Sequence, residues 1–181
     1  MKKKHFTLII LFTFFLTGCL QNTRVVHQSA ETPQLVRSPL QGRWIVTKVV
    51  HSIDEEDSMN QLIGKDAIFS PSVVIFHTQL IEEPKYSMTK VNTDHFLNLR
   101  YNKSRKELGV TADKLFLLGI YVGDEEYFEV LREKEDVAYI DIYGNILQLI
   151  KTKEDISDNQ VEILRKSTSE EQKYRSSAIA N

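Results

Sequence analysis

The chain is poor in cysteine, proline, glycine and tryptophan. Its 181 residues include one cysteine, four prolines, seven glycines and one tryptophan. A single cysteine excludes a disulfide framework, and seven scattered glycines are too few for a phosphate-binding loop or a dinucleotide fingerprint. Basic residues are not in excess, with 23 Lys and Arg against 25 Asp and Glu, so the chain lacks the field that nucleic-acid binding needs. What remains, 41% hydrophobic and 27% charged, is typical of one ordinary globular domain.

The first residues have the organisation of an export signal. Three lysines at positions 2–4 precede an almost wholly apolar run, Phe6–Leu16, which ends at Leu16-Thr17-Gly18-Cys19. Eleven helical residues rise about 16 Å, which is too short for a bilayer core of roughly 30 Å. The pattern therefore predicts a cleaved signal peptide over residues 1–18 and not a membrane-spanning helix.

The boundary before Cys19 resembles the lipobox of bacterial lipoproteins, with a leucine three positions before the cysteine and then two small residues. The resemblance implies that Cys19 receives a diacylglyceryl group, becomes the N-terminus after cleavage and carries a further fatty acyl chain such as palmitate. Since each buried methylene adds about 0.8 kcal/mol, such an anchor is stable. The protein is then expected on the extracytoplasmic side of the cell membrane, or, because Leu20 is not acidic, at the outer membrane of a cell with two membranes.

Composition divides the rest of the chain into three parts. Residues 19–39 are mostly polar and without periodicity, and predict a lipidated, flexible tether. A body follows over residues 40–153. Residues 154–181 form a polar C-terminal tail, in which Asp158 is placed to cap a short helix through Lys166.

The body is predicted to be all-β. Runs rich in apolar and β-branched residues indicate about eight strands, at 43–51, 65–69, 73–76, 85–91, 115–122, 127–131, 137–143 and 146–150. Short connections, among them a predicted two-residue turn at Gly144-Asn145, make neighbouring strands antiparallel. Such a meander of about eight strands is expected to close into a small barrel. Residues 58–63 and 93–108 predict one short helix each.

Two strands carry further information in their alternation. In 137–143, the side chains of Ala138, Ile140 and Ile142 form the better core-facing set. In 115–122 both faces are apolar, so this strand is expected to be covered on its outer side as well. The helix at 93–108 is the favoured cover, and an exposed apolar patch that binds a partner is the alternative.

Gly42-Arg43-Trp44 stands where the tether meets the first strand, and resembles the Gly-x-Trp of lipocalin-like (calycin-type) barrels. The resemblance covers residues 40–153 as architecture and implies that Gly42 and Trp44 close the bottom of the barrel. The family also places a late arginine across the tryptophan. Here Arg132 or Arg165 could take that place, and the sequence does not choose between them.

No catalytic or metal-binding pattern is found. Ser87 and Lys90 form a Ser-x-x-Lys sequence, but a strand would point residues three apart to opposite faces, whereas the known chemistry needs a helix. The histidines of the body, His51, His77 and His95, lack the spacing of metal ligands. The sequence therefore predicts a protein that is not an enzyme and has no cofactor and no metal site.

These observations predict a membrane-tethered envelope lipoprotein, favoured as a monomer, that binds a small apolar or amphipathic ligand in its barrel. The alternative is a protein-binding accessory or inhibitor of an envelope enzyme, using the rim loops or the strand at 115–122. Ligand-binding residues cannot be named from the sequence. A cavity of a few hundred cubic ångströms would favour the first function, and a filled interior would argue against it.

Overall fold

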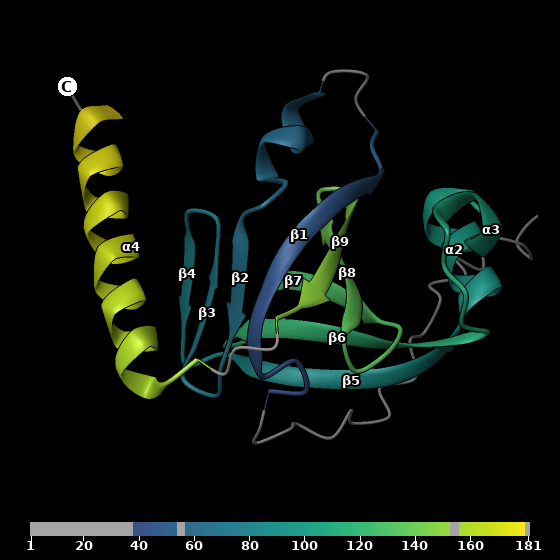
Figure 1. Ribbon diagram of the computed structural model, residues 1–181, viewed down its shortest axis with the longest axis horizontal. Helices are drawn as coiled ribbons and strands as arrows, with labels where there is room; N and C mark the ends of the chain where they lie inside the picture. The colour runs from purple at the N-terminus through teal and green to yellow at the C-terminus, as the bar shows by residue number, and fades with distance from the viewer. Residues whose placement is uncertain (1–37, 54–56, 153–155, 180–181) are drawn as a thin grey trace, which may run out of the picture. The chain divides into compact units, whose positions relative to one another are not determined.

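The computed structural model describes residues 38–53, 57–152 and 156–179, all of which belong to one unit of the chain, Thr32–Asn181 (Figure 1). Its strands are β1 (Gly42–His51), β2 (Asp66–Phe69), β3 (Val73–Phe76), β4 (Gln79–Glu82), β5 (Lys85–Asn92), β6 (Lys114–Val122), β7 (Glu125–Arg132), β8 (Val137–Ile142) and β9 (Asn145–Lys151). Its helices are the 3-10 helix η1 (Asp57–Leu62), α2 (Thr93–Tyr101), α3 (Arg105–Leu108) and α4 (Asp158–Ile179).

The strands form one antiparallel sheet in the order β4-β3-β2-β1-β9-β8-β7-β6-β5. The predicted β-rich antiparallel meander is confirmed, and each of the eight predicted strands is present. The additional strand is β4, four residues that pair with β3 directly after the turn at His77 and Thr78.

The predicted closure into a barrel is not found, because no ladder joins β4 to β5. Only Glu83 and Pro84 separate these strands, and β5 pairs over its whole length with β6 instead. Glu83 has a positive φ of 49° and Pro84 has no backbone N–H, so the connection does not continue a ladder. Among the described residues, the sheet therefore ends in two unpaired edges, β4 and β5.

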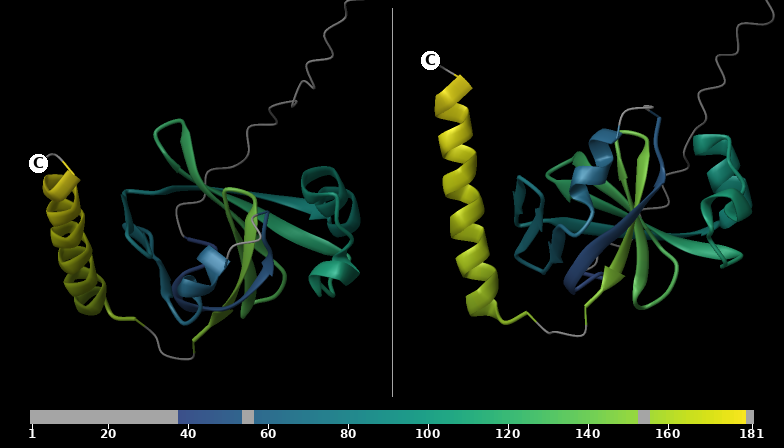
Figure 2. Two further views of the ribbon diagram at one scale, coloured as in Figure 1. Left: turned by 90° about the horizontal axis from the view of Figure 1, so that it is seen from above. Right: turned by 45° about the horizontal axis from the view of Figure 1, so that its top comes forward.

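The open sheet nevertheless curls around a common core (Figure 2). Ile81 of β4 and Tyr86 of β5 belong to the same buried cluster although they lie on the two opposite edge strands. The phenol of Tyr86 also donates a hydrogen bond of 2.7 Å to the backbone oxygen of Ser70, at the β2–β3 turn. Side chains of both edge strands therefore pack into one core, although no ladder joins these strands.

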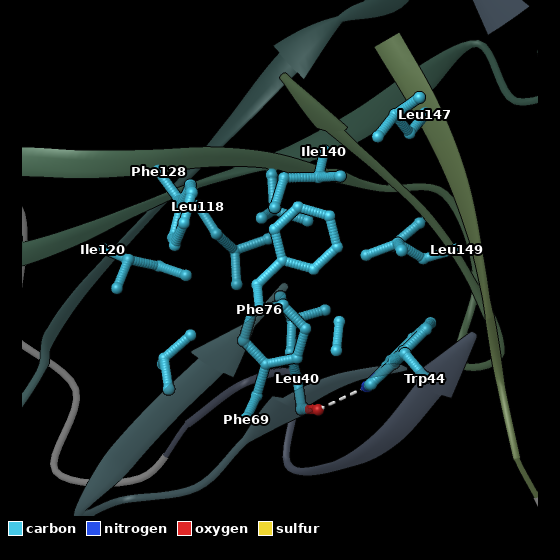
Figure 3. Close-up of a cluster of buried hydrophobic side chains, with 14 of the residues drawn as sticks. Leu40, Trp44, Phe69, Phe76, Leu118, Ile120, Phe128, Ile140, Leu147 and Leu149 are labelled. Carbon is cyan, nitrogen blue, oxygen red and sulfur yellow. Dashed lines mark hydrogen bonds between the residues drawn. The ribbon is translucent and has the colours of Figure 1, made fainter. Parts of the chain in front are cut away.

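The inside of the curled sheet is filled by eighteen buried apolar side chains, which come from all nine strands, η1 and residue 40. Figure 3 shows part of this cluster. Phe76 and Phe128 meet edge to face at 5.9 Å between ring centroids. Ala138 and Ile140 are members of the cluster and Ile142 packs against it, so the predicted core face of β8 is confirmed.

The outer face near β6 is covered by α2 and α3, where one helix was predicted over 93–108. The chain breaks that helix at Asn102, which is left-handed at φ 54°, and Ser104 begins the next turn with a capping box. Leu97 and Leu108 pack with Leu115 in a second buried cluster. The favoured prediction of a helical cover is confirmed, so this part of β6 is not an exposed patch.

The tail forms α4, a helix that continues well beyond the predicted end at Lys166. Its first turn is capped by Ser157 rather than Asp158, because the Ser157 hydroxyl accepts from the backbone N–H of Gln160 at 3.4 Å. Val161 packs against side chains of β2 and β3 in a third cluster, and α4 contacts both β3 and β4. No helix within the described ranges is long and apolar enough to cross a bilayer.

Candidate ligand pocket

A pocket of about 440 Å³ opens where three hairpins of the sheet and the end of η1 meet. It is lined by Leu62, Phe76, His77, Thr78, Gln79, Glu125, Glu126, Tyr127, Phe128, Asp141, Ile142 and Tyr143. These residues come from the β3–β4, β6–β7 and β8–β9 hairpins and from η1. The volume lies within the range of roughly 300–1,000 Å³ that small-molecule sites occupy.

The floor of the pocket is apolar and belongs to the buried core. Leu62, Phe76 and Phe128 are 5%, 2% and 8% exposed, and all three are members of the main core cluster. Ile142 packs against the same cluster from β8. The pocket therefore stands directly on the core, whose packing holds its floor in place.

The rim is formed by side chains of a different kind. Tyr127 and Tyr143 are 45% and 88% exposed, and both line the pocket. Tyr127 is the extra residue of a β-bulge, because Ile120 pairs with Phe128 while the next residue, Tyr121, pairs with Glu126. Bulges redirect side chains locally, and this one places a tyrosine at the rim.

The β8–β9 turn holds Tyr143 in an unusual conformation. Ile142 pairs with Asn145, so the two-residue turn is Tyr143-Gly144 and the predicted turn at Gly144-Asn145 is wrong by one residue. Tyr143 and Gly144 have φ values of 53° and 87°, the pattern for which Asn-Gly is preferred. The physical reason for the shift is Asn145, whose buried side chain accepts hydrogen bonds from Ser52 and from the backbone of Ile53.

His77, which begins the β3–β4 turn, also has a positive φ, of 53°. Two of the four non-glycine residues with positive φ in the described part of the chain, His77 and Tyr143, thus line the same pocket. A bulky residue held in this region typically costs about 1–3 kcal/mol, and such residues cluster at functional sites.

The three carboxylates of the lining differ in their surroundings. Asp141 is fully engaged, because one oxygen accepts from the Tyr101 hydroxyl at 2.8 Å and the other from the backbone N–H of Gly144 at 2.6 Å. Burial, followed by the hydrogen bond to Asp141, raises the pKa of Tyr101. Asp141 therefore supports the turn that carries Tyr143.

Glu125 and Glu126 point to opposite sides of the sheet. Glu126 pairs with Tyr121 on the outer face, where its carboxylate lies 2.7 Å from the position that a Cβ on Gly119 would take. Glu125 pairs with Val122, which alternates with Ile120 and so lies on the core-facing side of β6. Glu125 is exposed and makes no hydrogen bond or ion pair with another described residue.

A further acid, Glu129, lies on the outer face next to this region and was not anticipated. Its side chain is 15% exposed, and the Arg100 guanidinium lies 3.9 Å from its Oε1. That oxygen is buried and accepts no hydrogen bond from the described residues. Burial therefore raises the pKa of Glu129.

The residues of the lipocalin resemblance lie at the start of β1, away from the pocket lining. Trp44 is 1% exposed, and its indole Nε1 donates to the backbone oxygen of Leu40 at 2.7 Å (Figure 3). Gly42 has a φ of 127°, and a Cβ there would lie 2.8 Å from Cε of Lys151. The φ value favours glycine at this position, whereas the contact is with the flexible end of the Lys151 side chain, which can move aside.

Of the two candidate arginines, Arg132 lies near this segment. It donates a 2.7 Å hydrogen bond to the backbone oxygen of Pro39, and its guanidinium lies 5.5 Å from the ring centroid of Phe116. Arg165 is instead on α4, where it pairs with Glu82 of β4. Arg132 and Trp44 therefore hold two consecutive carbonyls, those of residues 39 and 40.

The remaining predicted positions do not join the pocket. Cys19 lies outside the described residues. Ser87 and Lys90 are on β5, and His51 and His95 line no part of the pocket. Across residues 38–53, 57–152 and 156–179, no group of three or more His, Cys, Asp or Glu side chains is arranged to hold a metal.

Comparison with models of protein families, with curated proteins and with solved structures finds no match for this chain.

Proposed function

We propose that this protein is an envelope lipoprotein, anchored through lipid on Cys19, that binds a small amphipathic molecule without chemical conversion. The sequence predicts a ligand inside a barrel, but core side chains fill the inside of the sheet, so the proposed site is the pocket between the three hairpins. The curled sheet serves as a lipocalin-like scaffold whose Trp44 end is packed and whose hairpin end receives the ligand.

The observation that supports this proposal is that the pocket has an apolar floor and a rim with polar groups. Buried aliphatic and aromatic side chains form its floor, and exposed tyrosines with a free carboxylate form its rim. Small-molecule sites are typically concave, mostly apolar and equipped with a few polar groups. An apolar ligand portion would remove water from the floor, while a polar end stays at the rim.

The strained turns support the same assignment. Asparagine or glycine at position 143 would satisfy the turn at lower energy than tyrosine. A tyrosine that costs stability at this position and contributes little burial, at 88% exposed, needs another reason to be there. Contact with a ligand supplies one.

The test is a pair of asparagine variants in the full chain, reconstituted in nanodiscs of zwitterionic lipid. Tyr143→Asn is expected to leave the melting temperature unchanged or raised, and to weaken binding of the neutral probe 4-phenylbutan-1-ol at least about fivefold. Glu83→Asn relieves a comparable positive φ outside the pocket lining and should leave probe affinity unchanged. Unchanged affinity in Tyr143→Asn, or no probe binding to the wild-type protein, would refute the proposal.

The protein-binding alternative has one observation in its favour, the exposed rim tyrosines, since aromatic side chains are enriched at protein interfaces. Its other predicted surface, the strand at 115–122, is covered by α2 and α3 in its first half. Retention of one envelope protein by the wild type, but not by Tyr143→Asn, would favour this alternative.

A further inference from the structure

The charges around the pocket are of one sign. Its lining contains Glu125, Glu126 and Asp141 and no lysine or arginine. Asp124, in the turn of the β6–β7 hairpin, adds a fourth acid beside the lining. A pocket whose rim is acidic attracts a cation and repels an anion.

Of the three carboxylates in the lining, Glu125 is the one that is without a described partner and lies on the core-facing side of its strand. Asp141 already accepts two hydrogen bonds, and Glu126 lies on the outer face beside Gly119. Glu125 stands on the core-facing side of β7, above the floor formed by Phe128, and has no partner among the described residues. Its charge is therefore available to a ligand.

Two tyrosines line the same pocket as this carboxylate. Tyr127 follows Glu125 by two residues on the same strand, and Tyr143 comes from the neighbouring rim hairpin; both line the pocket. Aromatic rings bind ammonium groups through their faces, and the attraction adds to that of a nearby carboxylate. An apolar floor, two tyrosines and one free carboxylate together fit a molecule that is apolar at one end and cationic at the other.

We propose that the ligand of this pocket is an amphipathic amine, protonated or quaternary, whose cationic group lies between Glu125 and the rim tyrosines. This assignment rests on the proposed function and narrows it to one class of small molecule. Fatty acids and other anionic amphiphiles are then poor ligands, because their carboxylates would face Glu125 with no lysine or arginine in the lining to offset it.

The test compares three probes that share one apolar group and differ in charge: 4-phenylbutylamine, 4-phenylbutan-1-ol and 4-phenylbutanoate. Calorimetric titration of the full chain in zwitterionic nanodiscs, with empty nanodiscs as the blank, gives the three dissociation constants. The ammonium probe is expected to bind about five- to tenfold more tightly than the alcohol, and the carboxylate more weakly than both.

Two variants test whether Glu125 causes the preference for the ammonium probe over the alcohol probe. Glu125→Gln should bring the ammonium and alcohol probes to within about twofold of each other. Glu135→Gln removes an exposed acid from the β7–β8 loop, beyond the far end of β7, and should keep the preference. Melting temperatures establish that both variants are folded.

The outcomes separate the two proposals. Equal binding of the amine and the alcohol, tighter binding of the carboxylate, or an unchanged preference in Glu125→Gln overturns the cationic assignment and leaves the ligand pocket standing. Failure of all three probes to bind folded wild-type protein overturns both.

Discussion

Truncation of Trp44 should be among the most damaging single changes in this protein. The indole is 1% exposed within the main core cluster, and its N–H satisfies the carbonyl of Leu40, itself a buried residue. Trp44→Ala removes the ring and the donor together, and large aromatic truncations in cores cost about 3–5 kcal/mol. Trp44→Phe keeps most of the apolar volume but leaves the Leu40 carbonyl without this donor, which costs about 1–3 kcal/mol.

Urea unfolding followed by far-ultraviolet circular dichroism measures both values. Fluorescence is unsuitable, because Trp44 is the only tryptophan of the chain. Leu99→Ala, at a position 80% exposed on α2, is the control and should change stability by no more than about 0.5 kcal/mol. If Trp44→Ala lowers the free energy of unfolding by less than about 1 kcal/mol, with an unchanged m-value (the slope of that free energy against urea concentration), the indole is not part of the core.

Cys19→Ser should abolish labelling by a radioactive fatty acid, and equal label on the variant would refute lipidation. Burial raises the pKa of Glu129, so the ionised carboxylate destabilises the folded protein at pH values above that pKa. This destabilisation is absent below the ordinary carboxyl pKa of about 4.5. Glu129→Gln should therefore raise the melting temperature by about 2–6 °C at pH 7 and leave it unchanged at pH 3. Deletion of 170–181 removes a hydrogen bond from Gln172 to Thr78 and should change the melting temperature by less than about 2 °C, whereas deletion from Asp158 also removes Val161 from its cluster and should lower it by several degrees.

The sheet was predictable because its information is local. The alternation of apolar residues in β8, and the apolar residues on both faces of β6, indicate which side chains are buried. The short connections indicate which strands are neighbours. Strand β4 was missed because Gln79-Leu80-Ile81-Glu82 offers only two apolar residues, and its pairing depends on the turn before it. Closure could not be derived from strand count, since it depends on whether the edges of β4 and β5 meet in register.

The turn at Tyr143-Gly144 shows why register needs tertiary information. Glycine and asparagine both tolerate positive φ, so local preference favours a turn at Gly144-Asn145. The buried side chain of Asn145 instead pairs with Ser52 and Ile53, more than ninety residues earlier in the chain. Those contacts keep Asn145 in β9 and move the tyrosine into the left-handed position.

The pocket had no signal in the sequence for a related reason. Its lining comes from four separate segments between Leu62 and Tyr143, and no spacing rule connects them. The nearest local indication is an exposed tyrosine before a hairpin glycine, which by itself is common.

The two ends of the sheet have different roles: the β1 end contributes mainly to stability, and the hairpin end carries the proposed ligand pocket. At the β1 end, Arg132 and Trp44 donate hydrogen bonds to the backbone carbonyls of residues 39 and 40, respectively, and so support the fold. At the hairpin end, the floor residues Phe76 and Phe128 are shared with the core, while Tyr143 contributes almost no burial. Substitutions at the rim can therefore change what the pocket binds at little cost to folding, whereas substitutions in the floor affect both. This separation is what makes Tyr143 and Glu125 informative positions: a loss of binding there, with an unchanged melting temperature, cannot be ascribed to a damaged core.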